Sequence, residues 1–401
     1  MKRPVEKIPR PVWLLGWASL FTDAGTEMIY PLLPIYLSKV LGAGAVSLGL
    51  IEGVAEGVNS VLKIVSGRLS DRWPRRKPIT IAGYALSSLA RPFIALTTSW
   101  LQVLAVRAVD RTGKGIRSAP RDAMLAECAT PSTRGRIFGF HRAMDHTGAV
   151  IGPLFASAFL WFMPGRYRLL FALTVIPGAL AVWTLFRVPE EARQTRSAEH
   201  VKARARPGAP GLPPRFYTLM VILLVFSLGN SADAFLLLRL SSVLGRDAYI
   251  PLLWACLHVV KVALSAYGGA LSDRVGRKAV IVTGWCAFAL VYVGFALVQS
   301  PAALVACFLA YGIYFGLAEG SEKALVTDLS PAHLRGTAFG FYNGALGLGA
   351  LVASVLFGVL YQTLGSAVAF GSGAALAGAA AVMLSMLPTT PVTGVPDGGA
   401  L

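Results

Sequence analysis

The sequence predicts an all-helical, polytopic membrane protein with twelve transmembrane helices in two pseudo-symmetric six-helix bundles. The first observation is composition: of 401 residues, 55% are hydrophobic and 14% are charged, whereas an average soluble domain is about 45–50% apolar and about 25% charged. The second is that apolar residues form stretches long enough to cross about 30 Å of hydrocarbon. The third is that the second half of the chain repeats the first.

Each apolar stretch is interpreted as one span. The first begins after a basic segment, as a signal peptide would, but it is too long, contains Asp23 and Glu27, and lacks a small-residue cleavage site. We therefore expect it to remain in the protein. The predicted spans are residues 12–36, 45–68, 78–98, 100–127, 136–161, 168–187, 216–241, 248–271, 279–299, 301–327, 337–361 and 366–387.

One long polar segment, rich in proline, arginine and glycine, divides the spans into two equal groups. Its composition is typical of a linker without a core of its own. The sequence thus predicts an N-terminal six-helix bundle over residues 1–187, a cytoplasmic linker over 188–215, a C-terminal bundle over 216–387 and a disordered tail over 388–401.

The net charge of +17 reflects topology rather than nucleic-acid binding. Basic residues gather in alternate loops, and the remaining loops hold only Lys39, Arg166, Arg168 and Arg246. Cytoplasmic loops are the ones enriched in lysine and arginine. We therefore expect both termini in the cytoplasm, the inner (cytoplasmic) membrane as the location, the lipid bilayer as a partner, and no nucleic acid.

The internal repeat is clearest in two loops, where Leu69-Ser70-Asp71-Arg72 recurs as Leu271-Ser272-Asp273-Arg274. The second copy matches G-x-x-x-D-R-x-G-R-K in full, and the first has Pro74 where glycine is usual. This signature resembles that of the major facilitator superfamily, which implies a secondary transporter built from two parallel halves. The implied gating-loop residues are Gly67, Asp71, Arg72, Arg75, Gly269, Asp273, Arg274, Gly276 and Arg277.

The fifth predicted span carries Gly139, Gly148, Gly152 and Pro153 with the spacing G-x8-G-x3-G-P. The pattern is similar to the signature of the proton-driven antiporters of that family, although Ala156 and Ser157 stand where a glycine pair is usual. Small residues let one helix press closely against another, and proline removes a backbone donor. The alternative interpretation is small-residue packing without any link to antiport.

Charged residues inside the spans need an explanation, because each cationic side chain at a helix centre costs about 2.5–3.5 kcal/mol on insertion scales. In the fourth span Asp110, Lys114, Arg117 and Arg121 share one helix face. One interpretation is a solute pathway. The other is a set of static ion pairs. For Arg107, Arg111, Asp122 and Lys323 the two interpretations have equal weight.

Two polar stripes in repeat-related spans predict opposite walls of one water-filled cavity. Glu322-Lys323 also occupies the repeat position of Arg121-Asp122 with the signs exchanged, which suits ion pairing within or between the halves. The candidate cavity residues are Glu52, Asn59, Lys63, Lys114, Arg117, Arg121, Arg142, Trp254, His258, Lys261 and Glu322.

Carboxylates in the first, second and fifth spans are candidates for proton coupling. Burial favours the protonated form of a carboxyl group, and a nearby cation favours the ionised form. A change in access that alternates these surroundings would couple proton movement to transport. The candidates are Asp23, Glu27, Glu56, Asp145 and His141; for His141 and His146 a helix-contact role is the alternative to a proton relay.

The leading hypothesis is proton-coupled export of a small organic solute, anionic or not, or of a drug, by alternating access, with a functional monomer. The runner-up is uptake of a small organic anion or metal chelate by proton symport. A non-transporting membrane protein or membrane enzyme is disfavoured, because no catalytic or phosphate-loop motif is present. Four scattered cysteines lack metal or disulfide spacing, so no metal site and no cofactor are expected.

Overall fold

The computed structural model describes residues 8–72, 75–128, 134–189, 211–331 and 334–388, and the secondary structure in these ranges is helical throughout. This confirms the all-helical class. Within the described ranges, eight stretches are long and apolar enough to cross a membrane, and Tyr249–Leu264 is a shorter apolar helix. The stretches are Ala45–Lys63, Lys77–Leu96, Tyr167–Phe186, Pro214–Val243, Arg277–Leu297, Pro301–Asp328, Ala338–Leu364 and Ser366–Met386.

In the first half of the chain, the described residues form six long helices and several short ones. The long helices α1, α5 and α6 carry many of the charges within the predicted spans. The bounds are α1 Arg10–Glu27, η1 Tyr30–Leu32, α2 Leu33–Ile35, η2 Tyr36–Val40, α3 Ala45–Arg72, α4 Lys77–Ala90, η3 Arg91–Leu96, α5 Trp100–Glu127, α6 Arg134–Phe162, α7 Tyr167–Leu173 and α8 Val175–Phe186.

The second half is more regular, with one interruption between its first two helices. Its helices are α10 Pro214–Gly229, α11 Ala234–Val243, α12 Tyr249–Val275, α13 Arg277–Leu297, α14 Pro301–Asp328, α15 Arg335–Leu364 and α16 Ser366–Met386.

Several predicted spans are not single α-helices. In the span 78–98, α4 is followed directly by the 3₁₀ helix η3, which contains Pro92, and prolines also break two other spans. Proline has no N–H and therefore cannot bond to the carbonyl four residues earlier. In the span 12–36, α1 ends at Glu27, four residues before Pro31. In the span 168–187, α7 ends at Leu173, four residues before Pro177. The span 216–241 is interrupted between α10 and α11 without a proline.

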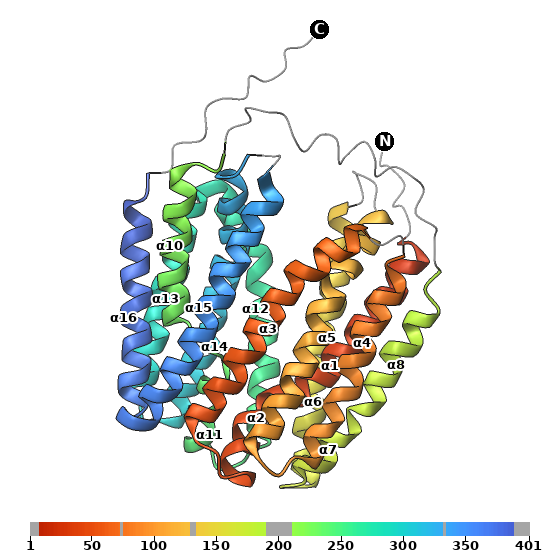
Figure 1. The fold of residues 1–401 in the computed structure, drawn as a ribbon. Helices are drawn as coiled ribbons and strands as arrows, with labels where there is room; N and C mark the ends of the chain where they lie inside the picture. The colour runs from red at the N-terminus through yellow and green to blue at the C-terminus, as the bar shows by residue number, and fades with distance from the viewer. Residues whose placement is uncertain (1–7, 73–74, 129–133, 190–210, 332–333, 389–401) are drawn as a thin grey trace, which may run out of the picture.

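The helices form two groups, one from each half of the chain (Figure 1). Within the first, α1 packs on α6 and α8, and α5 packs on α3 and α4. Within the second, α13 packs on α14 and α16, and α12 packs on α14. The principal contacts between the halves are α3 with α15 and α6 with α12. The space enclosed by these contacts lies between the halves.

The two ends of the molecule differ. At the end that carries η2 and α11, which we call the closed end, Lys39 Nζ lies 2.6 Å from Asp247 Oδ1 and Ser157 Oγ donates to the Ala248 carbonyl at 2.8 Å. At the opposite, open end, a Cβ built on Gly139 or Gly340 would meet nothing within 4 Å. Figure 1 shows the helix ends of the two halves spread apart there.

Candidate functional site

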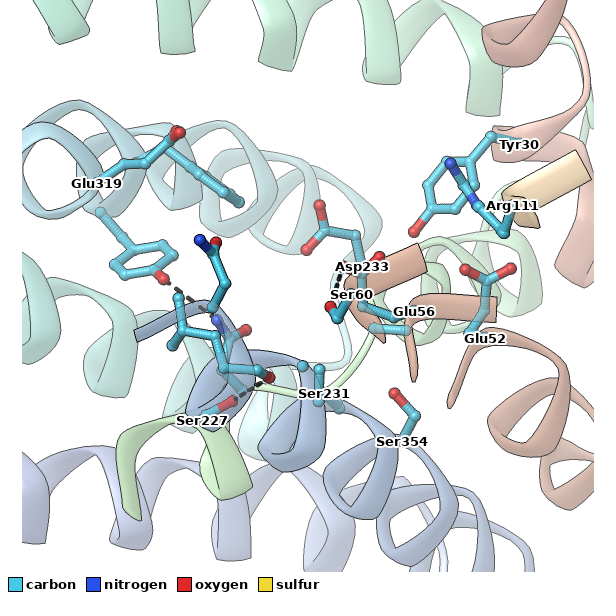
Figure 2. Close-up of a pocket in the computed structure, with 18 of the residues that line it drawn as sticks. Tyr30, Glu52, Glu56, Ser60, Arg111, Ser227, Ser231, Asp233, Glu319 and Ser354 are labelled. Carbon is cyan, nitrogen blue, oxygen red and sulfur yellow. Dashed lines mark hydrogen bonds between the residues drawn. The ribbon is translucent and has the colours of Figure 1, made fainter. Parts of the chain in front are cut away.

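A cavity of about 520 Å³ lies between the two halves. Residues of α1, η1, α3 and α5 form one wall, and residues of α10, the segment between α10 and α11, α12, α14 and α15 form the other. Figure 2 shows Arg111 beside Tyr30 on one side of this cavity and Glu319 on the opposite side. Cavities of this size commonly hold small organic ligands.

The cavity brings many of the predicted residues together. From the proton-coupling candidates it includes Glu27 and Glu56. From the candidate cavity residues it includes Glu52, Lys63, Lys114, Trp254, His258, Lys261 and Glu322. The residues that do not line it are Asp23, His141, Asp145, Asn59, Arg117, Arg121 and Arg142.

Several lining residues were not among the sequence candidates. Tyr30 follows the break after α1, and Asp233 lies in the break between α10 and α11. A single acid in an apolar span is itself a signal, so Asp233 was detectable from the sequence. Tyr30 was not, because its position depends on the break.

Glu27 connects the two halves. Its Oε2 atom accepts a hydrogen bond of 2.7 Å from Nε1 of Trp254 on α12. The rings of Tyr30 and Trp254 lie 5.2 Å apart, and His258 Nδ1 lies 3.0 Å from the Trp254 carbonyl. A carboxylate from the first half thus meets an aromatic group from the second.

Lys261, on the wall formed by the second half, is held by an acid and by aromatic rings. Its ammonium lies 3.5 Å from Asp233 Oδ2 and 3.5 Å from the centre of the Phe315 ring. Tyr311 donates to Asp233 Oδ1 at 2.8 Å. Cations over ring faces gain electrostatic stabilisation, so this charge is compensated inside its own half.

The exchanged-sign pairs interact within their own halves. Arg121 Nη2 lies 2.9 Å from Asp122 Oδ1, and Lys323 Nζ lies 2.8 Å from Glu319 Oε1. Glu322 accepts hydrogen bonds from Trp285 Nε1 at 2.9 Å and from the Tyr342 hydroxyl at 3.2 Å. No ion pair joins Arg121 to Glu322 among the residues that the structure describes.

A buried ionic network connects α3, η3 and α5. Arg91 Nε lies 3.0 Å from Asp110 Oδ1, and Arg107 lies 2.7 Å from Glu52 Oε1 and 3.7 Å from Asp110 Oδ2. All four side chains are buried. Arg91 also donates to the Thr22 carbonyl of α1 at 3.0 Å. Arg107 is therefore a static, paired charge, and Glu52 is engaged by it.

Asp110→Asn is expected to destabilise the fold strongly. It leaves Arg91 and Arg107 buried with less compensation, and breaking a buried pair costs about 3–5 kcal/mol. Asp122→Asn on the same helix is the control, since its half-exposed side chain belongs to a class of pair worth about 0–1 kcal/mol. Thermal unfolding in detergent measures both. Equal midpoints for the two variants would refute the structural role of Asp110.

Arg117 belongs to a second polar group, inside the first half. Its guanidinium lies 4.2 Å from the centre of the Tyr84 ring of α4, and only 3% of the residue is exposed. His141 Nδ1 lies 3.5 Å from Asp145 Oδ2, and Arg121 donates to Ser19 Oγ at 3.3 Å. These side chains stabilise contacts among α1, α4, α5 and α6 rather than facing the cavity.

The glycines of α6 face α1. A Cβ at Gly148 would lie 2.3 Å from the Leu20 carbonyl oxygen, and one at Gly152 would lie 2.3 Å from that of Ala24. Gly139 has no such neighbour. Pro153 lies inside α6, which continues through it. Two of the glycines therefore permit a close backbone contact with the helix that carries Glu27.

The two signature loops make equivalent contacts in the two halves. Arg76 pairs with Glu127 on α5, and Arg277 Nε lies 2.8 Å from Asp328 Oδ2 on α14. Gly276 caps α12 with φ of 100°, a conformation that favours glycine. Arg75 and Arg274 are exposed. The side-chain surroundings of Gly67, Asp71, Arg72, Gly269 and Asp273 lie outside the described residues.

A polar cavity between two helical halves, closed at one end and open at the other, defines a membrane transporter. The chain belongs to the Major Facilitator Superfamily, whose sequence profile matches residues 15–260 and 248–400. An uncharacterized MFS-type transporter of Methanocaldococcus jannaschii is 33% identical over 363 residues, which cover 89% of this chain and 90% of the relative.

More distant proteins share the same architecture. Multidrug resistance protein MdtH of Photorhabdus laumondii is 24% identical over 362 residues, covering 88% of this chain and 86% of MdtH. The inward open structure of the xylose transporter XylE from E. coli superposes with a TM-score of 0.75 at 18% identity and covers 96% of each chain. The protein is thus a multi-pass membrane transporter and not an enzyme.

Proposed function

We propose that the protein exports a small organic solute in exchange for protons, by alternating access between two six-helix bundles of residues 1–187 and 216–387. The observation that carries the proposal is the hydrogen bond between Glu27 and Trp254, which joins the halves at the cavity. Hydrogen bonds to ionised acceptors are about twice as strong as neutral ones. Protonation of Glu27 therefore weakens a contact between the halves.

This contact determines which access state the protonation of Glu27 favours. In the present conformation the halves meet at the closed end, and the ionised form of Glu27 stabilises that meeting. A proton that reaches Glu27 favours separation of the halves at the closed end. Release of the proton favours the return. Only a ligand with different affinities for the two states can shift their populations, and a proton on Glu27 meets this condition.

Two further features support export. The close packing of Gly148 and Gly152 against α1 places the antiporter-like motif directly behind the helix of Glu27. The relative MdtH is named a multidrug resistance protein. We also propose twelve spans, a functional monomer, an inner-membrane location, and both termini in the cytoplasm, where the basic loops indicate the cytoplasmic side. The open end then faces the cytoplasm, where an exporter collects its solute.

Proton symport of a small organic anion is the second candidate, and a specific observation favours it. Glu27 and Glu56 line the same cavity as Lys63, Arg111 and Lys114. Protonating either acid raises the net positive charge of the cavity and so favours an anion. Solute and proton would then bind together and move in the same direction.

The test begins with a thermal-shift screen of organic anions, drugs and metal chelates on the purified protein. A stabilising compound is then loaded into proteoliposomes and a pH gradient is applied. Antiport predicts movement of the solute against the direction of the proton gradient, and symport predicts movement with it. Both forms of coupling would be excluded if flux did not depend on the pH gradient and if replacing Asp23, Glu27, Glu56 or Asp145 by the amide had no effect on it.

The closed end offers a separate prediction. Asp247 accepts from Lys39 and from Tyr167 of the other half, so Asp247→Asn is expected to open this end more often. Contacts at partly exposed sites are worth up to about 1 kcal/mol, or about fivefold in population. A cysteine at Ser354 in a cysteine-free background, labelled by an impermeant maleimide from outside, reports this opening.

Arg168→Gln is the control, because Arg168 lies at the same end, is exposed and donates to the Thr97 carbonyl of its own half at 3.2 Å. Its labelling rate should match that of the parent protein. If Asp247→Asn left the rate unchanged, Asp247 would not hold the closed end.

A further inference from the structure

Three cations on one wall of the cavity stand apart from the other charges of the site. Lys63 lies on α3, and Arg111 and Lys114 lie on α5, all lining the cavity. Lys261, by contrast, has Asp233, and Arg107 has Glu52. In the described part of the chain, the side chains of Lys63, Arg111 and Lys114 have no ion pair within 4.0 Å and no hydrogen bond.

These three charges lie close to one another. Arg111 and Lys114 are one helical turn apart on the same face of α5. α3 is pressed against α5 beside Lys63, since Ser66 Oγ donates to the Gly115 carbonyl at 2.8 Å and a Cβ on Gly115 would lie 2.6 Å from Leu62 Cβ. Like charges at this spacing on a helix repel each other.

The acids nearby do not neutralise the group. Glu52 is paired with Arg107, and Glu27 accepts from Trp254. Glu56 accepts from Asn59 Nδ2 at 3.1 Å and from Ser60 Oγ at 3.4 Å. Glu27 and Glu56 are then the two carboxylates of the cavity that face the three cations, so the wall has an excess of positive charge, which grows when Glu27 is protonated. Clustered like charges away from bulk water are costly unless an opposite charge joins them.

We propose that Lys63, Arg111 and Lys114 form a binding subsite for a doubly charged anionic head group, either a phosphate or phosphonate ester or a pair of neighbouring carboxylates. The inference rests on the proposed transport function and names its substrate class. Arginine presents a planar pair of donors that fits such oxygens, and lysine adds a point charge. Two negative charges, added to that of Glu56, balance the three cations once Glu27 is protonated.

The opposite wall indicates the rest of the solute. Trp254, Tyr314, Phe315, Phe226 and Tyr342 line the cavity from the second half, together with Asn230 and Asn343. Aromatic walls stabilise flat apolar groups through offset or edge contacts. The solute we infer is therefore an aryl or similarly flat organic dianion, with its charged head on α3 and α5 and its body on α12 and α14.

The probes share one ring and differ in charge: phenyl phosphate, phthalate, benzoate and benzyl alcohol, with inorganic phosphate as the head alone. Binding to the purified full-length protein is measured by thermal shift and by tryptophan fluorescence at pH 7.5. Phenyl phosphate or phthalate should bind more tightly than benzoate, and benzoate more tightly than benzyl alcohol. Phenyl phosphate should bind more tightly than inorganic phosphate if the aromatic wall contributes.

Lys63→Gln, Arg111→Gln and Lys114→Gln should each weaken dianion binding about tenfold or more, because each removes a charged hydrogen-bond partner. Lys323→Gln is the matched control: Lys323 pairs with Glu319 and does not line the cavity, so it should stay within about twofold of the parent. The fluorescence titration of benzyl alcohol, which should be unchanged in all variants, checks that each cavity is folded.

Equal affinity for the dianions and benzyl alcohol, or an equal loss in Lys323→Gln, would overturn the subsite. Binding needs no pH gradient, so the result is separable from coupling. If a dianion binds as described but its flux does not depend on the pH gradient, the coupling proposal is wrong and the subsite proposal stands. If a neutral or cationic solute is transported in response to the pH gradient and the dianions are not bound, the subsite proposal is wrong and the coupling proposal stands.

Discussion

Gly152→Ala is expected to destabilise the protein by about 1–3 kcal/mol, the usual cost of forcing extra atoms into a packed contact. The added Cβ would lie 2.3 Å from the Ala24 carbonyl oxygen and 3.0 Å from the Ala24 Cα. Backbone atoms cannot move aside as a flexible side chain can, so α6 must retreat from α1. We expect a lower midpoint of thermal unfolding and a large loss of solute flux.

Gly139→Ala is the matched control within the same motif and helix. Its Cβ would meet nothing within 4 Å, and alanine is favoured over glycine in a helix by about 0.5–1 kcal/mol. Gly152→Ala should therefore lower the free energy of unfolding, and Gly139→Ala should raise it. If both variants were equally stable, the close contact between α6 and α1 would not be what these glycines provide.

Glu27→Gln is expected to abolish coupling while leaving the cavity intact. The amide oxygen can still accept the hydrogen bond from Trp254 Nε1, but the side chain can no longer carry a proton. Flux driven by a pH gradient should fall to the level measured without a gradient, because the side chain can no longer exchange a proton. Exchange of labelled for unlabelled solute, which needs no net proton movement, should persist.

Asp122→Asn serves as the control carboxylate, because Asp122 is exposed and paired with Arg121 outside the cavity. Gradient-driven flux in this variant should equal that of the parent. Normal coupling in Glu27→Gln would exclude Glu27 as the proton carrier, and Glu56, the other carboxylate candidate that lines the cavity, would be tested next.

Much of the fold could be predicted from the sequence because hydropathy is a local property. The length of an apolar run indicates a span wherever its partners lie. The helix break before Pro31 was not predicted, because residues 12–36 were expected to form one span; the missing backbone donor of Pro31 ends α1 at Glu27. The break between α10 and α11 contains Asp233 and no proline, so only the packed structure reveals it.

The site was less predictable, because spacing gives a helix face but not what covers it. Lys114 and Arg117 lie on the same face of α5, yet Lys114 lines the cavity and Arg117 packs on Tyr84 of α4. Arg107 and Arg111 are equally alike in sequence, and only Arg107 has an acid within ion-pair distance among the described residues. Whether a given turn of α5 faces the cavity or another helix depends on the tertiary packing.

Spin-label distances across the two ends of the molecule test the central claim, proton-driven alternating access. One pair replaces Gly139 and Gly340 at the open end, where neither has a neighbour within 4 Å. The other replaces Arg166 and Thr363 at the closed end, where both are exposed. Double electron–electron resonance on reconstituted protein records both distances at pH 8 and at pH 5.

Acidification should shorten the Gly139–Gly340 distance and lengthen the Arg166–Thr363 distance, because protonation weakens the contact of Glu27 with Trp254. In the Glu27→Gln background both distances should lose their dependence on pH. Distances that do not respond to pH in the parent protein, or that change in the same direction at both ends, would contradict proton-driven alternation of the two halves.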